Sequence, residues 1–266
     1  MNWASTEPYD EVPLVGRGFM GRDALLTDVR TRLVTSRGFA IATLNLDHAV
    51  KLRRMPTFRE AYSAHTHVVA DGNPIVWMER LAGRRAELVP GSDLVQPLAQ
   101  IAAEANVPLA LIGSTDVALK GASRALCHAA PGLSVGLTHA PSATFDPFSA
   151  EADRIIEAVR KSGAGLCMLA LGAPKQELFA ARLRRILPAL GVLSVGAGLD
   201  FLAGSQNRAP RIVRSVAMEW AWRLLNDPRR LAGRYALCAS LLPILSLEAL
   251  RFRWSAAPTR QHHVES

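Results

Sequence analysis

Asp71 is the residue in this 266-residue chain whose type and position best suit a general base. It follows a short apolar run, His67–Ala70, which predicts a buried strand, and Gly72 comes directly after it. Apolar surroundings penalise a charged carboxylate, so we expect the pKa of Asp71 to lie above its ordinary value, in a range useful to a base. An Asp-Gly pair also forms common turns, so a purely structural role stays open at this point.

The other candidate residues of the core share one position, the carboxyl end of a predicted strand. Ligands of doubly wound sheets bind beyond the carboxyl ends of the strands, so we expect these residues to line one cleft. Together with Asp71 they are Thr43, Asn45, Gly113, Lys175, Gln176, Gly196 and Gly198.

The stretch Leu166–Pro210 has the features of a phosphate site. An apolar run predicts a strand at 166–171, and Pro174 is suited to the first turn of the helix that follows. We expect the first amides of this helix, at residues 175–177, to be unpaired donors for a phosphate. The Gly-rich segment from Gly196 resembles a dinucleotide fingerprint, but Phe201 stands where the third glycine should be, which argues against a dehydrogenase.

The sequence predicts no metal site and no cofactor. It has no Asp-x-Asp pair, and His65 and His67, which are spaced to share one side of a strand, have no evident third ligand. The positive charge that a departing diphosphate needs would have to come from arginines and helix N-termini.

The elements that must position these residues alternate between strands and helices, which predicts an α/β fold with a mostly parallel, doubly wound, Rossmann-like sheet. We expect a lead-in at 1–15, a core at 16–210, a helical, basic appendage at 211–254 and a disordered tail at 255–266. Within the core, helices are expected to start near Arg22, Asp47, Thr57, Pro74, Ser92 or Asp93, Asp116, Glu151 and Pro174. The predicted strands are 39–44, 67–70, 109–113, 134–138, 166–171 and 192–195, with a short extended segment at 87–89.

The appendage carries most of the positive charge. Residues 205–254 contain nine arginines against three acidic residues, which accounts for +6 of the net charge of +8. This asymmetry favours an anionic partner, namely nucleic acid, a phospholipid surface or a diphosphate, and a solvated basic face is the plain alternative. Aromatic residues are sparse among the arginines, which disfavours nucleic acid.

Two segments of the appendage read as helical. The apolar spacing in 211–226 predicts one amphipathic helix, with Asp227 and Pro228 starting another. The apolar run 235–250 contains Pro243 and Glu248, and we expect it to be too short and interrupted to span a bilayer. Its arginine-flanked apolar faces suit either a membrane surface or docking on the protein's own core or a second subunit. Scattered cysteines and the absence of a signal-peptide pattern predict a reduced, cytosolic protein.

Taken together, the motifs resemble the WecG/TagA/CpsF glycosyltransferase family, in family order over roughly residues 15 to 240. The matching segments are Thr43-Leu-Asn45, Ala70-Asp71-Gly72, Val89-Pro-Gly91-Ser-Asp93-Leu94, Leu171-Gly-Ala-Pro174-Lys-Gln176-Glu177, Val195-Gly-Ala-Gly198-Leu-Asp200-Phe201, Ala203-Gly204, Arg208-Ala-Pro210 and Glu219-Trp220, followed by Arg223, Pro228, Arg230 and Arg234-Tyr235. The resemblance implies inverting transfer of a sugar from a UDP-sugar to a polyprenyl-diphosphate-linked acceptor at the cytoplasmic face of the membrane, in cell-surface polysaccharide synthesis.

The resemblance also implies roles for single residues. Asp71 matches the general base, Thr43 and Asn45 match residues beside it, and Gln176 matches a donor contact. Arg223 and Arg230 match arginines of the appendage that close over the site, and Arg234 is the candidate for a third. The family implies as well that the appendage aids membrane docking and that protomers self-associate. Where the family often has an arginine this chain has Leu88, and Arg84 or Arg85 is expected to take its place.

Overall fold

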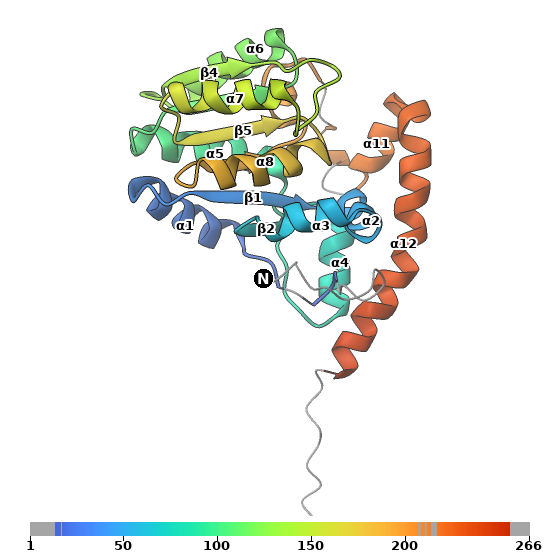
Figure 1. The fold of residues 1–266 in the computed structure, drawn as a ribbon. Coiled ribbons are helices and arrows are strands. Elements are labelled where there is room, and N and C mark those ends of the chain that lie inside the picture. The colour runs from blue at the N-terminus through green and yellow to red at the C-terminus, as the bar shows by residue number, and fades with distance from the viewer. Residues whose placement is uncertain (1–13, 17, 207–208, 211, 214–216, 256–266) are drawn as a thin grey trace, which may run out of the picture.

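A computed structural model describes residues 14–16, 18–206, 209–210, 212–213 and 217–255, and its centre is a six-stranded sheet. The strand order is β2-β1-β6-β5-β3-β4, and every pair is parallel, which confirms the predicted doubly wound α/β fold. The strands are β1 (Phe39–Leu44), β2 (His67–Ala70), β3 (Leu109–Gly113), β4 (Val135–His139), β5 (Leu166–Ala170) and β6 (Gly191–Ser194). In Figure 1 the strands β1 and β5 run toward the side of the molecule where α11 and α12 lie.

Helices cover both faces of this sheet because successive strand residues point to opposite sides. One face packs on α1 (Arg22–Val34), α5 (Gly91–Glu104), α6 (Asp116–Ala129) and α9 (Gly198–Leu202). The other face packs on α7 (Ala150–Lys161) and α8 (Lys175–Ile186). A third apolar cluster, around the ends of β1 and β2, joins α2 (Leu46–Arg54), α3 (Pro56–Ser63), α4 (Asn73–Leu81) and α12 (Pro228–Ser255).

Most boundaries agree with the sequence prediction, and the differences have local causes. The short helix α9 was not expected, because its Gly-rich start reads as loop. Helix α5 begins at Gly91 with Pro90 before it and without a side-chain cap, so the capping role predicted for Ser92 or Asp93 is wrong. The segment 87–89 forms no strand, although the Val89 amide donates to the Ala70 carbonyl at 2.8 Å.

The appendage differs more from its prediction. The single helix expected over 211–226 is wrong, because Ala217 has a positive φ of 60° and α11 begins only at Glu219, ending at Asn226. Pro228 then starts α12 as expected. Part of the intervening segment lies outside the described residues.

Helix α12 is longer than the sequence indicates. It runs 28 residues without a break at Pro243, and the stretch Leu231–Ser255 is long and apolar enough to cross a membrane by length and composition. The prediction that this run is too short and interrupted is therefore wrong. One face of α12 is buried, since Leu241, Leu245 and Ala249 belong to the cluster with α2 and α4. Leu237, Ile244, Leu247 and Trp254 of the same helix are exposed.

Candidate active site

Asp71, Thr43 and Asn45 lie together at the carboxyl ends of β1 and β2. The parallel register pairs Leu44 with Ala70, and the Asp71 amide donates to the Leu44 carbonyl at 2.7 Å, which extends the pairing by one residue. The side chains of Asn45 and Thr43 both hydrogen-bond to the Asp71 carboxyl. Asn45 is also the N-cap of α2, where its Oδ1 accepts from the His48 amide at 3.0 Å, so its amide nitrogen is the group left to donate to Asp71.

The pKa of Asp71 is raised to about 6. Desolvation by the surrounding protein is the largest cause, and the nearby Glu219 adds to the rise, whereas Arg223 and the bonds from Asn45 and Thr43 oppose it. As a whole residue Asp71 is only partly buried. A carboxylate that is mostly ionised at pH 7 and still binds a proton readily is suited to general-base work.

Helix α11 lies beside this carboxyl. The Arg223 Nη2 donates to Glu219 Oε1 at 2.6 Å, and the Arg223 guanidinium lies 5.7 Å from the centre of the Phe201 ring in α9. Both charged side chains act electrostatically on Asp71, so α11 places Arg223 near the strand-end residues.

Gln176 is held between two neighbouring loops. Its Oε1 accepts from the Gly196 amide at 3.1 Å, its Nε2 donates to Glu177 Oε1 at 2.7 Å, and its side chain is buried. Its own amide donates to the Gly172 carbonyl at 3.1 Å, so the free phosphate-binding amide expected at this residue is not present. Gln176 therefore fixes the start of the Gly196 loop, and Lys175 stands beside it as the first residue of α8.

Glu177 is a fully buried carboxyl behind Gln176. Burial raises its pKa to about 8 and lowers the pKa of the neighbouring His48 to about 3, so both groups are neutral at pH 7. Their 3.8 Å approach is therefore not an ion pair at that pH. The His48 Nδ1 in turn lies 2.5 Å from the Tyr62 hydroxyl. This chain of neutral polar groups joins α2, α3 and α8 behind the strand ends.

We predict that the unfolding free energy of the Glu177→Gln variant depends much less on pH between 6.5 and 8.5 than that of the wild type. The pKa of Glu177 is about 8 in the fold against an ordinary 4.5, so the folded state holds a proton that the unfolded chain releases between these values. Stability should therefore fall as pH rises toward 8, by up to about 1.4 kcal/mol per pH unit. Urea unfolding of both proteins at pH 6.5 and 8.5 measures the difference. An equally steep fall in the variant would show that Glu177 is not its source.

Three glycines allow close approaches at the strand ends. Gly113 has a φ of 117°, and a Cβ there would lie 2.4 Å from the Ala170 carbonyl oxygen, so β3 and β5 can end side by side only with glycine at this position. Gly91 starts α5 against Thr43, whose Cγ2 would be 3.1 Å from an added Cβ. Gly198 starts α9, and a Cβ added there would lie 3.2 Å from the Ser92 Cα.

The other arginines predicted for the site do not share one location in the structure. Arg234 lies in α12 with its Nε 3.7 Å from Asp47 Oδ1, so it bridges α12 to the first turn of α2. Arg230 lies in the first turn of α12, but its side chain is outside the described part, as is the whole of Arg208. Arg84 does not take the place expected for it in the site, because its guanidinium lies 5.4 Å from the Phe252 ring centre near the end of α12.

His65 and His67, the two histidines considered as metal ligands, have different hydrogen-bond partners. His65 Nδ1 lies 2.8 Å from the Ala61 carbonyl, and His67 Nε2 lies 2.8 Å from Asp28 Oδ2. Over the described residues no three His, Cys, Asp or Glu side chains are grouped so as to hold a metal ion.

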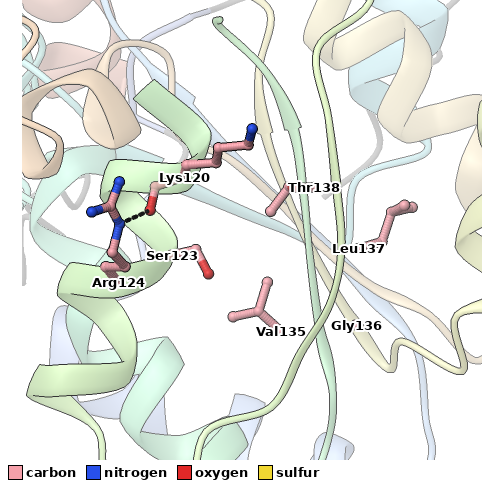
Figure 2. Close-up of a pocket in the computed structure, with 7 residues that line it drawn as sticks. All are labelled: Lys120, Ser123, Arg124, Val135, Gly136, Leu137 and Thr138. Carbon is pink, nitrogen blue, oxygen red and sulfur yellow. Dashed lines mark hydrogen bonds between the residues drawn. The ribbon is translucent and has the colours of Figure 1, made fainter. Parts of the chain in front are cut away.

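A surface hollow of about 400 Å³ lies elsewhere, between α6 and the edge strand β4 (Figure 2). Its lining contains none of the predicted site residues; it consists of Lys120, Ser123, Arg124, Val135, Gly136, Leu137 and Thr138.

Three contacts of the site were not foreseen from the sequence. Glu177 and Glu219 appear in recognisable motifs, but only the fold shows that one is buried behind Gln176 and the other faces Asp71. The Ser114 hydroxyl donates to Asp200 Oδ1 and so links the end of β3 to α9. Ser114 follows a strand-end glycine, which was the one available signal.

Comparison with known families gives the identity of the chain. The model of the glycosyl transferase WecG/TagA/CpsF family matches residues 18–257. The chain therefore belongs to this family, and the match extends over the appendage as well as the core.

Proposed function

We propose that this member of the family is an inverting glycosyltransferase that uses a UDP-sugar and a polyprenyl-diphosphate-linked acceptor. Membership makes it a glycosyltransferase of cell-surface polysaccharide synthesis, and the donor, the acceptor and the residue roles are our inference. The observation that supports it best is Asp71, a carboxyl with a raised pKa at the neighbouring ends of two strands, beside an arginine-bearing helix.

In the proposed reaction the sugar is transferred in a single displacement at the anomeric carbon. An acceptor hydroxyl attacks the anomeric carbon from the face opposite the diphosphate, a new carbon–oxygen bond forms, and the bond to the diphosphate oxygen breaks. Asp71 takes the hydroxyl proton, and UDP leaves with the bonding electron pair. Thr43 and Asn45 orient the Asp71 carboxyl through their hydrogen bonds.

Positive charge for the leaving diphosphate would come from the appendage. Arg223 lies over the site, and Arg230 and Arg234 follow on α12. Arginine suits this task because its planar guanidinium can give two parallel hydrogen bonds to phosphate oxygens. Gly113, Gly196 and Gly198 would let the strand-end loops approach the nucleotide closely.

The test is turnover of purified protein with a panel of donors and a lipid-diphosphate acceptor, followed as UDP release. UDP-N-acetylmannosamine, UDP-glucose and UDP-glucuronic acid share the diphosphate but differ in the sugar. Acceptor-dependent release with one of them supports the proposal. Salt-sensitive binding to any polyanion, with no UDP release from any donor, would instead favour a non-enzymatic binding protein.

We also propose that the exposed apolar face of α12 rests on the cytoplasmic surface of the cell membrane. Leu237, Ile244, Leu247 and Trp254 are exposed, and Arg251 and Arg253 are close to Trp254 in the chain. Apolar side chains that enter the interface, flanked by cations that face anionic headgroups, are the pattern of a helix lying on a membrane.

Substituting both Ile244 and Leu247 with Ser should weaken binding to anionic phospholipid vesicles by roughly 10-fold or more, because each loses apolar area that would enter the interface. Co-sedimentation with vesicles measures the change. Val117→Ser is the matched control, since Val117 is 80% exposed but lies on α6. Equal vesicle binding by the double variant and the wild type would contradict this orientation of α12.

A further inference from the structure

We propose that Glu219 is a positioning residue of the transfer reaction, which anchors the Arg223 guanidinium over the site and offsets its charge at Asp71. The inference rests on the proposed function, because it assigns a role within the same site. Glu219 was matched at the sequence level only as part of a Glu-Trp motif, with no role.

The ion pair that supports this role is local to α11. Arg223 and Glu219 lie one helical turn apart, and Nη2 donates to Oε1 at 2.6 Å. A guanidinium has five N–H donors, so a bond through Nη2 leaves others for an oxygen of the diphosphate. Glu219 can therefore hold Arg223 without excluding its use in catalysis.

Two contacts join α11 to its neighbouring helices. The guanidinium of Arg223 lies over the Phe201 ring in α9, at 5.7 Å from the ring centre. Trp220 packs edge-on against Tyr235 of α12, with ring centres 6.4 Å apart. These contacts set α11 between α9 and α12, so the charges of the pair are held near the strand ends.

The charged and titratable groups that face Asp71 then decide how strong a base it is. From α11 come Arg223, which lowers the pKa of Asp71, and Glu219, which raises it. Thr43 and Asn45, at the end of β1, are uncharged and donate hydrogen bonds to the carboxyl. Tyr62 of α3 also interacts with Asp71, and burial raises the pKa of this phenol well above its usual range.

An arginine alone beside Asp71 would favour the charged carboxylate and make it a weaker base. The proposed reaction needs that arginine for the leaving diphosphate. Its positive charge therefore weakens the base unless a second anion offsets it. Glu219 supplies this anion in the free enzyme. The diphosphate adds its own negative charge when it binds.

Three substitutions at Glu219 separate its charge from its contact. Glu219→Gln keeps an oxygen that can accept from Arg223 but removes the charge, so the pKa of Asp71 should fall. Glu219→Asp keeps the charge and should leave the pKa near its wild-type value. Glu219→Ala also frees the Arg223 side chain, and kcat should fall by about 10-fold because the cation is no longer held in position.

The first measurement needs no substrate. The carboxyl carbon of Asp71 is titrated by ¹³C NMR in the ligand-free protein and assigned by its loss in Asp71→Asn. The second is the acidic limb of kcat/KM against pH, which should move to lower pH in Glu219→Gln by the same amount. Glu157→Gln is the control, since Glu157 pairs with Arg160 one turn along α7, away from the site, and its loss should leave the pKa of Asp71 unchanged.

An unchanged or raised pKa of Asp71 in Glu219→Gln would overturn the inference, as would an equal shift in Glu157→Gln. A wild-type protein that transfers no sugar would count against the proposed function alone, because the NMR titration still decides whether Glu219 offsets Arg223 at Asp71.

Discussion

The Asp71→Asn variant is expected to lose roughly 10²- to 10⁴-fold in transfer rate, the usual contribution of a positioned general base. Asparagine has nearly the same shape and can still bond to Thr43 and Asn45, but it cannot take the proton from the acceptor hydroxyl. UDP binding should be largely unchanged, because Asp71 is not assigned to the diphosphate. Single-turnover rates and UDP affinity by calorimetry measure the two effects separately.

The pH dependence of kcat/KM is a second test of Asp71 as the general base. The pKa of Asp71 is raised to about 6, mainly by desolvation, so the carboxylate form that can act as base is lost as pH falls through 6. Wild-type kcat/KM should therefore drop tenfold per pH unit on the acidic side of this value. Nearly full activity of Asp71→Asn, or a profile that is flat down to pH 4.5, would remove Asp71 from the chemistry.

Two leucines of α12, two residues apart, are predicted to have opposite effects. Leu245 is fully buried among side chains of α2 and α4, so Leu245→Ala should lower the unfolding free energy by about 2–5 kcal/mol. Leu247 is 57% exposed, and Leu247→Ala should change stability by no more than about 0.5 kcal/mol. Urea unfolding measures both.

Vesicle binding should show the reverse order. Leu247→Ala should weaken it, whereas Leu245→Ala, measured below its unfolding temperature, should not. If Leu247→Ala proves as destabilising as Leu245→Ala, the exposed face of α12 must be covered by protein, as in contact with a second subunit. The pair therefore separates docking on the membrane from docking on another protomer.

The fold was predictable because its signals are local. The short apolar runs that became β1, β2, β3 and β5 are bounded by glycine and polar residues, and the helices between them show regular apolar spacing. Parallel strands separated by helices leave few alternative topologies. The start of α11 could not be predicted, because residues 211–226 keep helical spacing through Ala217, whose left-handed conformation interrupts the helix.

The site was predictable only in its outline. The rule that ligands bind beyond strand ends selects Thr43, Asn45 and Asp71 from the sequence alone. It does not distinguish a residue that faces a ligand from one that braces a loop, and Gln176 does the second here, through Gly196 and Glu177. Contacts between residues far apart in the chain, such as Ser114 with Asp200, depend on tertiary packing that a local pattern does not encode.

Helix α2 connects the two functional surfaces of the molecule. Asn45 at its start holds Asp71, Asp47 in its first turn faces Arg234, and Arg53 in its last turn pairs with Glu248, so both ends of α2 are tied to α12. Any shift of α12 on a membrane that moves α2 would alter the carboxyl that we propose as the general base. Thermodynamic linkage then works in both directions: if vesicles change the affinity for the UDP-sugar by some factor, the UDP-sugar changes the affinity for vesicles by the same factor.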